Sequence, residues 1–209
     1  MRRIMVAGIG TDVGKTVVSA ILTLLFQGDY WKPIQCGNEA NSDTATMKGW
    51  LEGSERVIHP PAYSFQAPVS PHAAARLEKM AISTESISLP ETTRPLIIEG
   101  VGGLLVPYTV DRLTIDLFAS WRCSWVVVSK HYLGSINHTL LTIEALKRRR
   151  VPLLGLIFNG APHPDTEEAI LQISELPLLG RLFPEQNLNL QTFQRYGEQW
   201  QSNFYKHLP

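Results

Sequence analysis

The stretch GIGTDVGKT, residues 8–16, decides the fold of this 209-residue chain. It follows a short apolar run at 4–7 and leads into an amphipathic segment at 15–27. Backbone N–H groups in such a glycine loop, together with the first turn of the following helix, bind polyphosphate. Lys15 would add a positive charge there, and the Thr16 hydroxyl is a suitable magnesium ligand. The segment therefore predicts a binding site for a nucleoside triphosphate.

The spacing of the glycines makes this prediction more specific. Gly8 and Gly14 enclose five residues, one more than in the common loop G-x-x-x-x-G-K-[ST], which indicates a subclass of phosphate loop. A dinucleotide-binding loop G-x-G-x-x-G is disfavoured, because Val13 stands where its third glycine would fall. A glycine loop arising by chance is also disfavoured, since Gly-Lys-Thr stands between a predicted strand and a predicted helix.

Apolar runs and amphipathic segments alternate along the chain. The apolar runs predict strands at 4–7, 95–98, 125–128 and 153–158. The amphipathic segments predict helices at 15–27, 43–51, 71–80, 114–121, 136–149, 165–175 and 187–207. Strands without a polar face are typical of a mostly parallel sheet with helices on both faces. We expect one α/β domain over residues 1–209, with helix and loop at 63–92 and ligands at the carboxyl ends of the strands.

The composition excludes several classes of function. Nineteen Lys and Arg balance nineteen Asp and Glu, which argues against general nucleic-acid binding. No apolar run is long enough to span a membrane, and Asp12 and Lys15 interrupt what resembles a signal peptide after Met1. Two cysteines are too few for a disulfide scaffold or a thiolate zinc site. We expect a soluble cytoplasmic protein that binds neither nucleic acid nor membrane.

Two carboxylates are candidates for magnesium binding. Glu99 follows the apolar run at 95–98 and precedes a glycine-rich stretch, which places it where a parallel sheet opens toward a ligand. Asp43 stands where a helix is predicted to begin. Each has a plainer alternative, because Glu99 could be a surface carboxylate and Asp43 a charge that favours the helix N-terminus.

A second lysine, Lys32, precedes Pro33 in the run YWKP (30–33) and is predicted to lie at the end of a short strand. If this strand lies next to the phosphate-loop strand, Lys32 reaches the same cleft as Lys15, and two ammonium groups would stabilise anionic intermediates there. The alternative is a solvated lysine. A nucleophilic role for nearby Cys36 is disfavoured, since no histidine is evidently placed as its base. The six histidines show no i, i+4 pair of the kind that binds zinc.

At this point the chain resembles a known family, the dethiobiotin synthetases. The resemblance rests on the order and spacing of TDVGKT (11–16), KPIQCG (32–37), NSD (41–43), SPH (70–72), EGVGG (99–103), LGSINH (133–138), Asn159 and PLLG (177–180). It implies a P-loop NTPase-like fold and an ATP-dependent cyclo-ligase of biotin biosynthesis. Carbon dioxide adds to one amine of 7,8-diaminopelargonic acid, ATP phosphorylates the carbamate, and the second amine closes the ureido ring, releasing phosphate and ADP. No enzyme nucleophile is required.

The resemblance also implies roles for individual residues. The implied ATP site consists of Thr11, Asp12, Val13, Gly14, Lys15, Thr16, Asp43, Glu99, Gly100, Val101, Gly102, Asn159, Pro184 and Glu185, with Asn159 at the adenine edge. The implied magnesium ligands are Thr16, Asp43 and Glu99. The implied catalytic residues are Thr11, Lys15 and Lys32. The implied substrate site consists of Cys36, Val101, Gly102, Gly134, Ser135, Ile136 and Asn137, with the last four supplied by the partner subunit of a homodimer.

The chain departs from the family pattern at three places. Cys36 stands where the family usually has serine or threonine, and a thiol is a weaker hydrogen-bond partner. Only sixteen residues separate Lys15 from Lys32, so the first helix and second strand should be short. The proline of the adenine-side loop, Pro184, is shifted by one position.

Two alternatives remain for comparison. A P-loop ATPase switch of the partition or septum-positioning type carries an additional lysine early in the loop, where this chain has Gly10. An amidotransferase of the cobyric-acid type needs a glutaminase domain, for which 209 residues leave no room.

Overall fold

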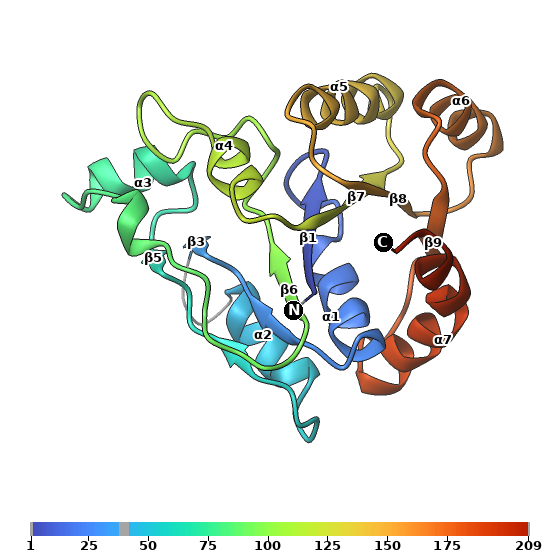
Figure 1. Ribbon diagram of the computed structural model, residues 1–209, viewed down its shortest axis with the longest axis horizontal. Coiled ribbons are helices and arrows are strands. Elements are labelled where there is room, and N and C mark those ends of the chain that lie inside the picture. Colours follow the sequence, from blue (N-terminus) through green and yellow to red (C-terminus); the bar gives the residue numbers. More distant parts are fainter. Residues whose placement is uncertain (1, 38–41, 209) are drawn as a thin grey trace.

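A seven-stranded parallel sheet forms the centre of the molecule, a computed structural model that describes residues 2–37 and 42–208 (Figure 1). Its strand order is β4-β2-β6-β1-β7-β8-β9, and every pair of neighbours is parallel. The strands are β1 (Arg3–Gly8), β2 (Asp29–Trp31), β4 (Ile58–His59), β6 (Leu96–Glu99), β7 (Ser124–Lys130), β8 (Leu153–Asn159) and β9 (Leu178–Leu182). A separate pair is formed by β3 (Ile34–Cys36) and β5 (Tyr63–Phe65).

Helices cover both faces of the sheet, as Figure 1 shows. One face carries α1 (Lys15–Leu25), α2 (Asp43–Trp50) and α7 (Leu190–His207). The other carries α3 (Pro71–Leu77), α4 (Thr114–Ala119), α5 (Ser135–Arg148) and α6 (Pro164–Ser174). A 3-10 turn, η2 (Thr84–Ser86), lies between α3 and β6.

The two-residue period of the strands divides the core between these faces. In β1, Ile4 and Val6 pack with α1 and α7, whereas Met5 and Ala7 pack with α4 and α5. This alternation gives two apolar layers, one on each side of a sheet in which β1, β2, β6, β7 and β8 are mostly buried. Helix α7 approaches β9 so closely that a Cβ on Gly180 would lie 2.4 Å from a Trp200 ring carbon. The last helix is therefore part of the core.

The predicted α/β class, the mostly parallel sheet and the helices on both faces are confirmed. The four strands predicted from apolar runs, the short strand before Lys32 and the seven predicted helices all occur, with ends that differ by a few residues. The first helix has 11 residues and β2 has three, as the spacing between the two lysines predicts. Among the described residues, no helix is both long and apolar enough to cross a membrane.

One expectation about strands is wrong, and a condition stated for Lys32 is not met. The segment 63–92 contains the strand β5 in addition to helix and loop. This strand was not predicted, because its three residues, 63–65, are too few for an alternation of apolar and polar side chains to be recognised. The strand that precedes Lys32 does not lie next to the phosphate-loop strand, since β6 stands between β2 and β1. Which strands become neighbours depends on long-range pairing that local periodicity does not encode.

Candidate active site

The phosphate loop joins β1 to α1, and Gly14 stands at a position where the backbone conformation requires glycine. Gly14 has φ 98°, a left-handed conformation that side chains other than glycine rarely adopt. A Cβ at Gly14 would also lie 2.5 Å from Nδ2 of Asn159. Asn159, at the end of β8, donates from Nδ2 to the carbonyl oxygen of Val13 over 2.8 Å. The loop is thus fastened to a strand two places away in the sheet.

Lys15 is buried at the beginning of α1 and folds back over the loop. Its Nζ donates to the Gly10 carbonyl oxygen at 2.7 Å. Burial is the main cause that lowers the pKa of Lys15 to about 8, with opposing attraction from Glu99. A phosphate group approaching this ammonium would favour its protonated form.

Three oxygen-bearing side chains converge beside Lys15. The Thr16 hydroxyl lies 2.6 Å from Oδ1 of Asp43 and 3.0 Å from Oε1 of Glu99. Ser42 caps α2 by accepting a hydrogen bond from the Ala45 N–H, and this cap places Asp43 in the first turn. Glu99 ends β6 at the carboxyl edge of the sheet. The tertiary structure therefore brings together the three residues predicted for magnesium.

These oxygens fit magnesium by their chemistry. Magnesium in nucleotide sites takes one or two carboxylates and completes its octahedron with phosphate and water oxygens. Two carboxylates and one hydroxyl match that donor set. Among the described residues, no group of three or more His, Cys, Asp and Glu side chains is placed to hold a metal ion by itself. The site thus suits a cation that arrives with the nucleotide.

Lys32 neutralises both carboxylates. It follows β2, is 6% exposed, and its Nζ contacts Oδ2 of Asp43 as well as Oε1 of Glu99, the latter at 3.0 Å. Burial alone would lower the pKa of Lys32, but attraction to Glu99 and Asp43 outweighs it and raises the pKa. The pKa of Asp43 is lowered, because attraction to Lys32 outweighs the cost of burial. Lys32 reaches the cleft although β6 separates its strand from β1.

A cleft of about 810 Å³ opens from this cluster and is lined by phosphate-loop residues on one side and by residues 68–71 on the other. Cys36 lines it as well. Burial raises the pKa of the Cys36 thiol to about 11, so the group is protonated at neutral pH. This agrees with the expectation that Cys36 is not a nucleophile.

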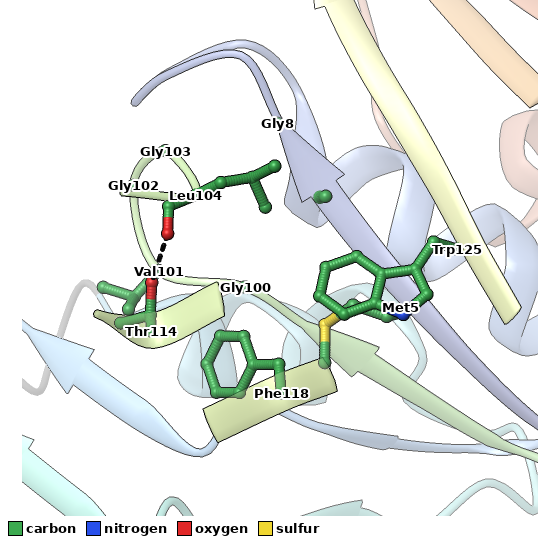
Figure 2. Close-up of a pocket in the computed structure, with 11 residues that line it drawn as sticks. Met5, Gly8, Gly100, Val101, Gly102, Gly103, Leu104, Thr114, Phe118 and Trp125 are labelled. Atoms are coloured by element: carbon green, nitrogen blue, oxygen red, sulfur yellow. Dashed lines mark hydrogen bonds between the residues drawn. The ribbon is translucent and has the colours of Figure 1, made fainter. Parts of the chain in front are cut away.

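The glycine-rich loop after Glu99 forms another wall of the cleft, with Val101 and Gly102 lining it. Figure 2 shows this loop above a small cavity lined by Met5, Phe118 and Trp125. The cavity measures about 10 Å³, room for one water molecule and no substrate. The Thr114 hydroxyl donates to the Leu104 carbonyl over 3.1 Å and ties the loop to α4 (Figure 2).

Two groups of predicted site residues lie apart from the cleft lining. Gly134 and residues 135–137 form the exposed beginning of α5, where only Ser135 is buried. Pro184 and Glu185 follow β9, and the Glu185 carboxylate accepts hydrogen bonds from Tyr196 at 2.6 Å and Arg195 at 2.5 Å. One chain therefore assembles the phosphate and carboxylate part of the predicted site and leaves these two groups at its periphery. Asn41 of the NSD motif and Met1 lie outside the described residues.

Some residues of the site were not predicted. The Tyr30 hydroxyl donates to Oε2 of Glu99 at 2.9 Å, and burial raises the pKa of Tyr30 well above its ordinary value. The Gln35 side-chain oxygen accepts from the Asp43 N–H at 3.2 Å. Tyr30 stands two positions before Lys32, so the two-residue period of a strand could have placed both on one face.

The fold and the phosphate loop define the chain as a P-loop nucleotide-binding protein. It matches the AAA domain family over residues 2–192. Two solved structures share the fold over 99% of both chains, each with a TM-score of 0.59. One is a plasmid partition protein from Borrelia burgdorferi at 12% identity, and the other is the cell-division ATPase MinD from Pyrococcus furiosus at 16%. At such identities the likeness concerns the fold alone.

Curated relatives define the family more narrowly. The ATP-dependent dethiobiotin synthetase of Chlamydia pneumoniae is 46% identical over 96% of this chain and 90% of its own length. The corresponding protein of Chlamydia abortus is 47% identical over 96% and 95%, and that of Cytophaga hutchinsonii is 42% identical over 99% and 100%. The chain belongs to the dethiobiotin synthetase family.

Proposed function

We propose that residues 1–209 form one ligase domain that closes the ureido ring of dethiobiotin from 7,8-diaminopelargonic acid and carbon dioxide at the expense of ATP. The observation that carries the proposal is the convergence of Thr16, Asp43 and the buried Lys32 and Glu99 beside the phosphate loop. Family membership over nearly the whole chain supports it. The site supplies charge and position, which is what a reaction without an enzyme nucleophile requires.

The chemistry begins when one amine of the substrate adds to carbon dioxide and forms a carbamate. The carbamate oxygen attacks the γ-phosphorus of ATP, giving a carbamic-phosphoric anhydride and ADP. The second amine then attacks the carbonyl carbon, the C–O bond to phosphate breaks, and the ring closes. Magnesium, when bound, shields the negative charge of the phosphates. Lys15 and Lys32 stabilise the carbamate and the transferring phosphoryl group, and the Thr11 side chain lies at the same end of the cleft.

The remaining parts of the ATP site are assigned by position. Backbone groups of Asp12, Val13 and Gly14 hold the phosphates, with Gly100 to Gly102 alongside. The family resemblance assigns Asn159 to the adenine edge, and its amide nitrogen holds the Val13 carbonyl oxygen of the phosphate loop. Pro184 and Glu185 border the base. Thr16, Asp43 and Glu99 hold Mg²⁺.

The binding site for the carboxylate tail of the substrate is assigned to the interface of a homodimer. The beginning of α5 directs backbone N–H groups and the positive end of the helix dipole toward an anion, which suits the carboxylate of diaminopelargonic acid. Leu133 and Ile136 are exposed there, and Leu141 continues the apolar surface along α5. A second subunit covering this surface would bring residues 134–137 to its partner's cleft, beside Cys36. The cytoplasm is the proposed location.

The test is product formation by the purified protein. Mass spectrometry should detect dethiobiotin only when diaminopelargonic acid, bicarbonate, Mg²⁺ and ATP are all present, with one phosphate released per ring closed. The alternative, an ATPase switch, predicts phosphate release that DNA or lipid vesicles stimulate and diaminopelargonic acid does not. That result would contradict the proposed function.

A further inference from the structure

Tyr30 is a fully buried tyrosine whose hydroxyl reaches the metal end of the cleft. It lies in the middle of β2, opposite Ile97 of β6, in a parallel register that continues to Trp31 and Ile98. Because strand residues alternate between faces, Tyr30, Lys32 and Glu99 all project to the α1 side of the sheet. The ring packs in the apolar layer shared by α1, α2 and α7, and its hydroxyl is 2.9 Å from Oε2 of Glu99.

The hydrogen bonds of Glu99 divide between its two oxygens. Oε1 accepts from Thr16 and Lys32, each at 3.0 Å. Oε2 accepts from the Tyr30 hydroxyl. Because each carboxylate oxygen has its own partner, the carboxylate cannot rotate without losing a hydrogen bond. Glu99 is only 1% exposed, so a water molecule could not readily replace the lost partner. The arrangement leaves Oε1 as the oxygen that faces Thr16.

The chemistry of Tyr30 suits this task. A lysine or arginine in its place would add a positive charge next to a carboxylate that must attract a cation. A phenol donates one hydrogen bond without adding charge. Its rigid ring is fixed by the surrounding apolar layer, so the position of its hydroxyl is determined by the core of the domain.

We propose that Tyr30 is a positioning residue that holds Glu99 with Oε1 toward the magnesium of the bound nucleotide. This inference rests on the magnesium site of the proposed function and goes beyond it by assigning the residue that orients one ligand. Through this contact the packing of β2 against β6 fixes the geometry of the metal end of the cleft. Lys32, two residues further along the same chain segment, is fixed by the same packing.

The experiment measures ADP binding by calorimetry with Mg²⁺ and with EDTA. The ratio of the two affinities reports the contribution of the metal and does not depend on ligase turnover. Tyr30→Phe removes only the hydroxyl, and the loss of a hydrogen bond to a charged group should reduce this ratio about tenfold, with ADP affinity in EDTA unchanged. Tyr63→Phe is the matched control. It removes a hydroxyl that accepts from the Ser83 N–H at 2.9 Å, outside the cleft, and should leave the ratio as in the wild type.

A second variant keeps the test decisive if Tyr30→Phe folds poorly. Tyr30→4-aminophenylalanine keeps the ring and a neutral N–H donor at the same place, so it should retain most of the magnesium dependence. The proposal is overturned if Tyr30→Phe retains the wild-type ratio, if it weakens ADP binding equally with and without Mg²⁺, or if the 4-aminophenylalanine variant loses the ratio. A merely structural role would lower the melting temperature without changing the ratio. If the wild-type protein fails the ligase assay but shows the magnesium-dependent ratio, and Tyr30→Phe reduces that ratio, the proposed function is contradicted and the role of Tyr30 is supported.

Discussion

The phosphate end of the cleft and the beginning of α5 differ in how completely one chain builds them. At the phosphate end, Lys15, Lys32 and Glu99 are all buried and each has a hydrogen-bond partner. At the beginning of α5, Leu133 is fully exposed and residues 136 and 137 are also open to solvent. One chain therefore builds the phosphate end of the cleft by itself, whereas the proposed role of α5 in holding the substrate tail would require a second subunit to cover this surface.

The largest effect is expected from the phosphate end. Lys15→Ala should reduce turnover by about a thousandfold, because it removes a charge aimed at the transferring phosphoryl group. Circular dichroism should show an intact fold, since Lys15 acts through charge and not through the apolar core. Lys48→Ala, an exposed lysine in the last turn of α2, is the control and should retain full turnover. An unfolded Lys15→Ala protein would remove the support for this assignment.

The second effect concerns Lys32. Lys32→Ala should lower kcat by about a hundredfold and change the KM for ATP only a few-fold, because its ammonium acts on the carbamate and phosphoryl group. The free energy of unfolding should fall by about 3 kcal/mol, since Asp43 and Glu99 lose their buried counter-charge. Thermal melting with added Mg²⁺ should recover part of this loss. An unchanged kcat would show that Lys32 does not act on the substrate.

The third effect concerns the exposed beginning of α5, which is the proposed contact between subunits. If the proposed homodimer forms through α5, Leu133→Asp should dissociate it and raise the KM for diaminopelargonic acid about tenfold or more, because burying an unpaired charge in an apolar interface is costly. Magnesium-ADP binding should be unchanged, since the phosphate end lies within one chain. Ile173→Asp, on the exposed surface of α6, is the matched control. Light scattering gives the oligomeric state. A monomeric Leu133→Asp protein with an unchanged KM would contradict the shared site, and a dimeric one would contradict the placement of the interface at Leu133.

The fourth effect follows from the pKa of Lys15, about 8 in the free protein. ADP binding favours the protonated form of the Lys15 ammonium. At pH values near and above 8, where the free protein has lost part of this proton, ADP binding should therefore be accompanied by proton uptake at Lys15. At pH 9 about one tenth of Lys15 is protonated, and affinity should be about tenfold weaker than at pH 7. Calorimetry in buffers of different ionisation enthalpy measures the uptake. Affinity that stays constant from pH 7 to 9 would contradict it.

The smallest effect is expected at Cys36. Cys36→Ser should leave the KM for diaminopelargonic acid within about twofold or lower it, because a hydroxyl is the better hydrogen-bond partner. Cys123→Ser is the contrasting variant, since its thiol is buried outside the cleft and its change should affect melting temperature and not KM. A large rise in KM for Cys36→Ser would assign the thiol a role of its own.

The sequence by itself determined the features that depend on neighbouring residues. Strand, glycine loop and helix follow each other directly at residues 3–25, so the phosphate loop with Lys15 and Thr16 could be recognised from spacing alone. Continuous apolar runs likewise predicted the parallel sheet with two covered faces, since their pattern reflects burial. The position of Glu99 after such a run already placed it at the ligand edge.

Only the tertiary structure decided which distant residues meet. Thr16 contacts Asp43 and Glu99 across 27 and 83 positions of sequence, and Lys32 joins them from a strand that is not adjacent to β1. The hydrogen bond from Tyr30 to Glu99 spans 69 positions. Local periodicity tells which face of a strand is buried, but the pairing of strands depends on the packing of the whole sheet. For that physical reason the order of β2, β6 and β1, and with it the role of Tyr30, could be found only in the folded molecule.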